Sequence, residues 1–96
     1  MRLQEVQEQV DAWIREHGGY WPEWVLLARL TEEVGEVAAA LQRLRGYRPY
    51  ASQADLAEEV GDVLFILAAF ANAQGLHLEE CLRQALRKYT QRASTG

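Results

Sequence analysis

The run DLAEEVGDVLFILAAFANAQ, residues 55–74, carries the pattern that decides the fold. At about 100° per residue, one helical stripe gathers its regularly spaced apolar side chains, which are Leu56, Val60, Val63, Leu67 and Phe70. Further apolar residues lie off this stripe, namely Phe65, Ile66, Ala68 and Ala69. A helix that is apolar on two sides is usually buried on two sides. We therefore expect a helix that ends near Gln74 and packs against both its own chain and another subunit.

Three other amphipathic segments surround this one, and together they predict an all-α, four-helix unit. They cover Leu3–Glu16, Pro22–Arg45 and Leu78–Arg92, and their inward residues include Trp13, Val34 and Leu41, then Leu82, Leu86 and Tyr89. Gly-containing turns separate the helices at 17–19, 46–54 and 75–77. Ser52 or Asp55 caps the third helix, and Asp55 with Glu58 has the spacing of a capping box.

Length and composition narrow the class of protein. The chain has 96 residues, of which 49% are hydrophobic and 25% charged, so we expect one globular domain spanning 1–96. It contains no apolar run of the ~18 residues that a membrane-spanning helix needs. The N-terminus does not resemble a secretory signal, and the lone Cys81 has no internal disulfide partner, so we expect a cytoplasmic protein. The net charge of −4 argues against a nucleic-acid partner but not against a small anion held through a metal.

Two short acidic motifs repeat each other on the second and third helices. They are TEEVGEV (31–37) and AEEVGDV (57–63), and both place two acids three residues apart at the edge of an apolar stripe. If the two stripes face each other, Glu33, Glu36, Glu59 and Asp62 converge along one edge of the helix pair. Crowded carboxylates must take up protons or bind cations.

The donor set of this cluster favours a hard cation. All four candidate ligands are oxygen donors without His or Cys, which suits Mg²⁺, or alternatively Mn²⁺, better than zinc. A di-iron bundle site would place His where Glu36 and Asp62 stand. Gly35 and Gly61 sit inside the two motifs although Gly costs about 1 kcal/mol in a helix, so we expect a helix or ligand to pack closely there.

The paired motif resembles the ExxE…ExxD signature of the MazG-like, all-α nucleoside triphosphate pyrophosphohydrolases. The similarity continues in residues 28–31, 62–65, 71–72 and 88–92, and it spans roughly Val10 to Arg92. The resemblance implies Mg²⁺-dependent cleavage between the α and β phosphates, with Glu33, Glu36, Glu59 and Asp62 as metal ligands. It also implies that Glu32 positions or deprotonates the attacking water.

Several other residues are candidates for substrate binding. Lys88 and Arg92 can reach phosphates from the fourth helix, although both also suit the C-terminal end of a helix dipole. Asn72 can bind a sugar or base, or it can be a buried amide that satisfies a helix end. Arg45 and Arg48 can close over phosphates. We expect the aromatic residues near the second helix to serve packing more than base stacking; they are Trp21, Trp24, Tyr47 and Tyr50. We expect no special role for Glu58, His17 and His77.

The sequence thus favours an oligomeric nucleotide pyrophosphohydrolase, a homodimer or dimer of dimers, that removes noncanonical or surplus (d)NTPs. Two alternatives stay open. One is phosphoribosyl-ATP hydrolysis by the same superfamily, and the other is a non-catalytic, metal-binding oligomerisation module. No segment beyond the four helices offers to enclose a base, so the base preference is left undetermined.

Overall fold

Four α-helices account for the fold over residues 1–47 and 52–95, the part of the chain that the computed structural model describes. They are α1 (Leu3–Glu16), α2 (Glu23–Leu44), α3 (Gln53–Ala73) and α4 (Leu78–Thr95). All four predicted helices are confirmed, and α4 continues past its expected end at Arg92. None of the helices in the described residues is both long and apolar enough to span a bilayer.

The start of α3 shows how local chemistry sets a helix boundary. Ser52 is the N-cap: its hydroxyl accepts a hydrogen bond from the Asp55 backbone N–H at 3.3 Å. The Asp55 carboxylate in turn accepts one from the Ser52 backbone N–H at 2.7 Å. The capping box is therefore Ser52–Asp55, and the expected Asp55–Glu58 box is wrong by one helical turn.

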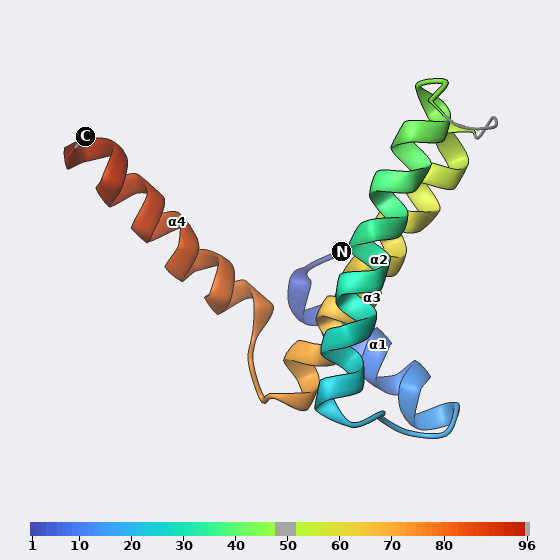
Figure 1. Ribbon diagram of the computed structural model, residues 1–96. Coiled ribbons are helices and arrows are strands. Elements are labelled where there is room, and N and C mark those ends of the chain that lie inside the picture. Colours follow the sequence, from blue (N-terminus) through green and yellow to red (C-terminus); the bar gives the residue numbers. More distant parts are fainter. Residues whose placement is uncertain (48–51, 96) are drawn as a thin grey trace.

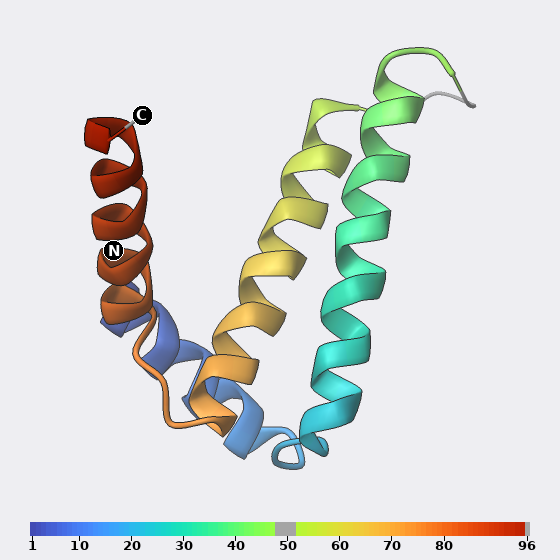
Figure 2. The ribbon, with the colours of Figure 1, turned by 60° about the vertical axis from the view of Figure 1, so that its left-hand side comes forward.

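The helices α2 and α3 lie side by side as a long antiparallel hairpin, and α1 lies across the end of it that is distant from the 45–52 connection (Figures 1 and 2). The core gathers where the three helices meet and consists of Val10, Ile14, Leu26, Ala68 and Ala69. Small alanines on α3 allow α1 and α2 to approach it closely. The hairpin thereby holds the acidic segments of α2 and α3 opposite each other.

The burial of α3 differs in part from our expectation. Its buried residues are Ile66, Ala68, Ala69 and Ala71, whereas Val60 is 52% exposed and Leu67 37% exposed. These two residues of the expected stripe face outward, whereas Leu56 and Val63 are half-buried and Phe70 packs against the core. The fully buried positions lie on the alanine-rich side, where α1 and α2 pack. On α2, Leu27, Val34 and Leu41 are likewise exposed. Within a single chain, the hairpin therefore presents a broad uncovered apolar surface.

Helix α4 projects away from the hairpin (Figure 2). Its main contacts are with α1, and its apolar residues Leu82, Leu86 and Tyr89 are half exposed, so the expectation that they face inward is wrong for one chain. The radius of gyration is 16.0 Å, compared with about 12.5 Å for a compact chain of this length. The accessible surface is 7099 Å², compared with about 5,600 Å² for a compact monomer of this mass.

One buried polar side chain fixes the direction of α4. Gln7 of α1 is 8% exposed. Its Nε2 donates to Asn72 Oδ1 at 2.9 Å and to the Leu76 carbonyl at 2.8 Å. Its Oε1 accepts from the Leu78 backbone N–H at 2.8 Å, at the first residue of α4. The side chain thus caps α4 and joins it to α1 and α3.

Candidate metal centre and the adjoining aromatic pocket

Three of the four predicted metal ligands converge across the helix hairpin. Glu33 comes from α2, and Glu59 and Asp62 come from α3, where their spacing of three residues places them on one face. One carboxylate oxygen of each lies within 4.8 Å of the others. Such a group of oxygen donors from two helices suits a hard divalent cation.

The fourth predicted ligand and the predicted catalytic glutamate lie outside this group. Glu36 is exposed and is not among the three converging carboxylates, although its charge is near enough to act on Glu59. Glu32 is also exposed, with 62% of its side chain accessible, and pairs with Arg29 at 3.5 Å. Both side chains therefore face solvent at the rim of the cluster.

Electrostatics reflect the crowding of these acids. The pKa of Glu59 is raised above its ordinary value of 4.5, first by desolvation and then by the charges of Asp62, Glu36, Glu33 and Glu58. The charged form of Glu59 is therefore disfavoured in the metal-free protein. A divalent cation would reverse this effect, because it stabilises the deprotonated carboxylates that bind it.

Arg29 is the nearest compensating charge. Its guanidinium Nη2 pairs with the Glu33 carboxylate at 3.2 Å, and only 13% of the Glu33 side chain is exposed. The Arg29 Nε is a buried donor without an acceptor among the described residues. The same guanidinium lies 5.8 Å from the centre of the Trp21 ring. Arg29 thus lies between the acidic cluster and the Trp21 ring.

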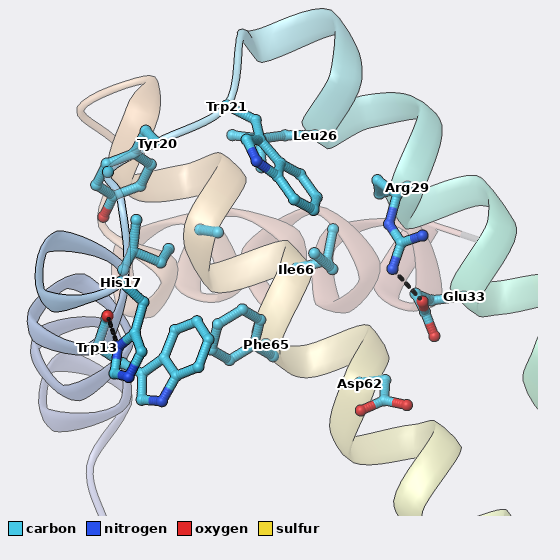
Figure 3. A pocket seen from close by; sticks show the side chains of 13 residues that line it. Trp13, His17, Tyr20, Trp21, Leu26, Arg29, Glu33, Asp62, Phe65 and Ile66 are labelled. Atoms are coloured by element: carbon cyan, nitrogen blue, oxygen red, sulfur yellow. Dashed lines mark hydrogen bonds and ion pairs between the residues drawn. The ribbon is translucent and has the colours of Figure 1, made fainter.

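Trp21 and other aromatic residues line a pocket of about 360 Å³ between α1, α2 and α3. Figure 3 shows Trp13, His17 and Phe65 on one side, Trp21 reaching in from another, and Glu33 and Asp62 at the far end. The sequence pattern did not indicate this pocket. It placed Trp13 in the core, but the indole is 52% exposed. It gave His17 no role, yet the imidazole stacks on Trp13 at 4.0 Å and lines the pocket.

The structure does not bring the three predicted substrate residues to the carboxylates within one chain. The half-buried Asn72 exchanges hydrogen bonds with Gln7, as donor to its backbone carbonyl at 3.0 Å and as acceptor from its side-chain amide at 2.9 Å, so the Asn72 side chain joins α3 to α1. Lys88 and Arg92 lie on the projecting α4 (Figure 2).

The remaining expectations concern the glycines and the central loop. A Cβ built at Gly35 or Gly61 would meet nothing within 4 Å, so none of the residues that the structure describes packs closely there. Tyr47 is 81% exposed and does not line the aromatic pocket. Arg48 and Tyr50 lie outside the described residues.

Comparisons with known proteins identify a family and a relative that this chain resembles. The model of the MazG nucleotide pyrophosphohydrolase domain matches residues 23–96. The uncharacterized protein YpjD of Bacillus subtilis (strain 168) is 35% identical over 94 residues, which cover 94% of this chain and 85% of YpjD.

Two solved structures are also similar. The crystal structure of the Bacillus-conserved MazG protein, a nucleotide pyrophosphohydrolase, superposes with a TM-score of 0.81 at 32% identity, over 93% of this chain and 90% of that one. The crystal structure of YpjD from Bacillus subtilis gives a TM-score of 0.83 at 33% identity, over 93% and 95% of the two chains.

Proposed function

The chain belongs to the MazG nucleotide pyrophosphohydrolase family, and from this premise we propose that it cleaves (d)NTPs to (d)NMPs and pyrophosphate with Mg²⁺. The observation that carries the proposal is the convergence of Glu33, Glu59 and Asp62 within 4.8 Å. These carboxylates would hold Mg²⁺, or Mn²⁺ in its place. When bound, the cation would neutralise phosphate charge. It would also lower the pKa of a bound water molecule toward neutral pH.

The protein's own residues have mainly positioning to supply, as is general for phosphoryl transfer. Glu33 is well shielded, with 13% of its side chain exposed, and Arg29 holds its carboxylate from the side of the aromatic pocket. Glu36 stands at the rim and would complete the ligand set when a cation draws it inward. Glu32, one residue before Glu33 and open to solvent, is the proposed group that orients an attacking water and takes its proton.

We also propose that the working form is a homodimer or a dimer of dimers. The surface in excess of a compact monomer is roughly 1,500 Å², whereas a stable dimer buries about 800 Å² on each partner. The exposed apolar residues of the hairpin and of α4 are the ones that we propose a second copy covers. They include Val34, Val60, Leu64, Leu82 and Leu86. A second copy that covers α4 would allow Lys88 and Arg92 to reach phosphates held by the partner's carboxylates.

A product analysis tests this function. Purified protein is incubated with each of the common (d)NTPs, with oxidised and deaminated (d)NTPs, and with phosphoribosyl-ATP, with either Mg²⁺ or EDTA. We expect Mg²⁺-dependent release of pyrophosphate and a monophosphate from (d)NTPs, including noncanonical ones. If the protein hydrolyses phosphoribosyl-ATP but no (d)NTP, its activity is the alternative one, phosphoribosyl-ATP hydrolysis. Cation binding without any turnover would identify a non-catalytic module and overturn the proposal.

A further inference from the structure

We propose that Arg29 is an exchangeable counter-ion of the metal centre. Its guanidinium neutralises Glu33 while no substrate is bound, and a phosphate of the substrate takes it over when the cation binds. The inference deepens the proposed function and rests on it, since it concerns the same site. It assigns Arg29 to phosphate binding, and it makes tight cation binding depend on the presence of phosphates.

The ion pairs of Arg29 are suited to exchange because neither is a tight one. Its Nη2 lies 3.2 Å from Glu33 Oε1, and its Nη1 lies 3.5 Å from Glu32 Oε2. Charge-assisted hydrogen bonds between arginine and a carboxylate are usually about 2.7–2.9 Å long, and the strongest pairs are bidentate to one carboxylate. Here one guanidinium is shared between two acids, so neither acid holds it firmly.

The guanidinium also has a donor that its present partners leave unused. The Arg29 Nε is buried and has no acceptor among the described residues. A buried donor without a partner is unfavourable. The planar guanidinium can offer Nε–H and a neighbouring N–H as a parallel pair, which matches two oxygens of one phosphate. Turning from the two carboxylates to a phosphate would therefore satisfy a donor that is unsatisfied now.

The position of Arg29 places it where phosphates are expected. It lines the aromatic pocket, beside the end that carries Glu33 and Asp62 (Figure 3). Among the described residues that line this pocket, Arg29 alone has a permanent positive charge. Since 41% of its side chain is exposed, the guanidinium can turn without disturbing the core.

The cation and Arg29 compete for the same carboxylate. A cation held by Glu33, Glu59 and Asp62 needs the side chain that Arg29 now neutralises. Arginine does not give up its proton in proteins, so the repulsion between the two positive charges persists until an anion neutralises the guanidinium. Phosphates would do this, and each ligand would then strengthen the binding of the other by the same factor.

Titration of the metal-free protein with Mn²⁺ alone gives the first test, with free Mn²⁺ followed by electron paramagnetic resonance. We expect Arg29→Met to bind Mn²⁺ at least about fivefold tighter than the wild type, the lower end of typical coupling between sites. Arg29→Lys keeps the charge and should stay close to the wild type. Glu59→Gln should lose this binding, which identifies the site that is titrated.

Arg83→Met is the matched control for both tests. Arg83 pairs with Glu79 at 3.1 Å with the same spacing of four residues, but it lies on α4 and does not line the pocket. Its replacement removes the same charge and should leave both affinities unchanged. Circular dichroism checks the fold of each variant.

Calorimetric titration with inorganic tripolyphosphate, in excess Mg²⁺, gives the second test. This probe carries the phosphate charge without a base. We expect Arg29→Met to bind it at least about tenfold more weakly than the wild type, because a hydrogen bond between charged groups is lost. Arg29→Lys should restore part of the affinity. One substitution thus tightens cation binding and weakens phosphate binding.

The opposite signs separate exchange from a merely structural role. An arginine that only orients Glu33 predicts that Arg29→Met weakens the binding of both Mn²⁺ and tripolyphosphate, and that result overturns the inference. An unchanged Mn²⁺ affinity, or tighter Mn²⁺ binding with unchanged tripolyphosphate binding, overturns it as well. So does a wild type that does not bind tripolyphosphate.

Neither titration requires turnover, so failure of this inference is distinct from failure of the proposed function. If the wild type hydrolyses no (d)NTP while the two affinities of Arg29→Met shift in opposite directions, the exchange stands and the pyrophosphohydrolase activity falls. If turnover is normal while both affinities fall together, the activity stands and the exchange is wrong.

Discussion

The neighbouring residues Glu58 and Glu59 offer a matched test of the acidic cluster. Glu59 converges with Glu33 and Asp62, whereas Glu58 is exposed and lies outside that group. Replacing either with Gln removes the same charge one position apart on α3. We expect Glu59→Gln and Asp62→Asn to reduce kcat at least a hundredfold with the helical fold intact, and Glu58→Gln to keep most activity. Equal activity of the Glu58 and Glu59 variants would contradict this placement of the cation.

The raised pKa of Glu59 predicts a pH dependence of stability in the metal-free protein. The folded state binds this proton more tightly than the unfolded chain, so the stability falls as the pH rises from about 4.5 through the raised pKa. The lowered pKa values of Asp11 and Asp55 act in a different window, below 3.8, where their stabilising contribution is lost.

Urea denaturation in EDTA measures this dependence. The stability of Glu59→Gln relative to the wild type should increase from pH 4.5 upward, since the variant lacks the unfavourable charge. Excess Mg²⁺ should reverse the order, because it stabilises the wild type through binding to the folded state. A difference between the two proteins that is independent of pH and of Mg²⁺ is the result that this account does not allow.

At the residue scale, the sequence predicted the acids much better than the aromatic residues. The acids Glu33, Glu59 and Asp62 follow helical periodicity, and periodicity together with one helix pairing is enough to bring them together. The pocket depends on how α1 crosses the hairpin, which no local pattern specifies. The sequence did contain one signal for the pocket. Trp13 and His17 are four residues apart, which places their rings on one helical face, and a Gly-Gly turn and Trp21 follow.

At the scale of the helices, Gln7 holds α1, α3 and α4 together. Gln7→Ala would leave the Leu78 N–H, the Leu76 carbonyl and the Asn72 Oδ1 without their Gln7 side-chain partners. Each unsatisfied buried group costs about 1–3 kcal/mol. With partial access to water, we expect a total loss of about 2–4 kcal/mol in the free energy of unfolding. Gln4→Ala, an exposed position on the same helix, is the control and should change the stability by less than about 0.5 kcal/mol.

The glycine of the second acidic motif gives a prediction of opposite sign. A Cβ at Gly61 meets nothing within 4 Å, and Ala is favoured over Gly inside a helix by about 1 kcal/mol. Gly61→Ala should therefore raise the free energy of unfolding by up to that amount in thermal or urea denaturation. A loss of stability would instead show that a second molecule approaches the backbone at Gly61. The sequence led us to expect such a close contact with a helix or a ligand.

The helices themselves were predictable because their termini carry local signals, such as the Gly-containing turns and Ser52 before α3. Which side of α3 faces the chain was not predictable, because the helix is apolar nearly all round and periodicity then fails to choose a face. The alanines took the buried side, where close approach of two helices matters more than side-chain size.

At the scale of the whole molecule, the exposed apolar surface predicts self-association. Light scattering should give a dimer or tetramer at micromolar concentration. Leu86→Glu places a charge on the half-exposed apolar face of α4 and should shift the protein toward monomer. Gln84→Glu adds the same charge on the other side of α4 and should not do so. A wild-type monomer under these conditions would refute the proposed assembly, and with it the route that brings Lys88 and Arg92 to the phosphates.

The most direct test of the central claim is anomalous diffraction from crystals soaked with Mn²⁺. The account predicts a manganese peak between the carboxylates of Glu33, Glu59 and Asp62, at the end of the aromatic pocket. A peak elsewhere in the molecule, or no peak at a Mn²⁺ concentration that supports activity, would contradict it.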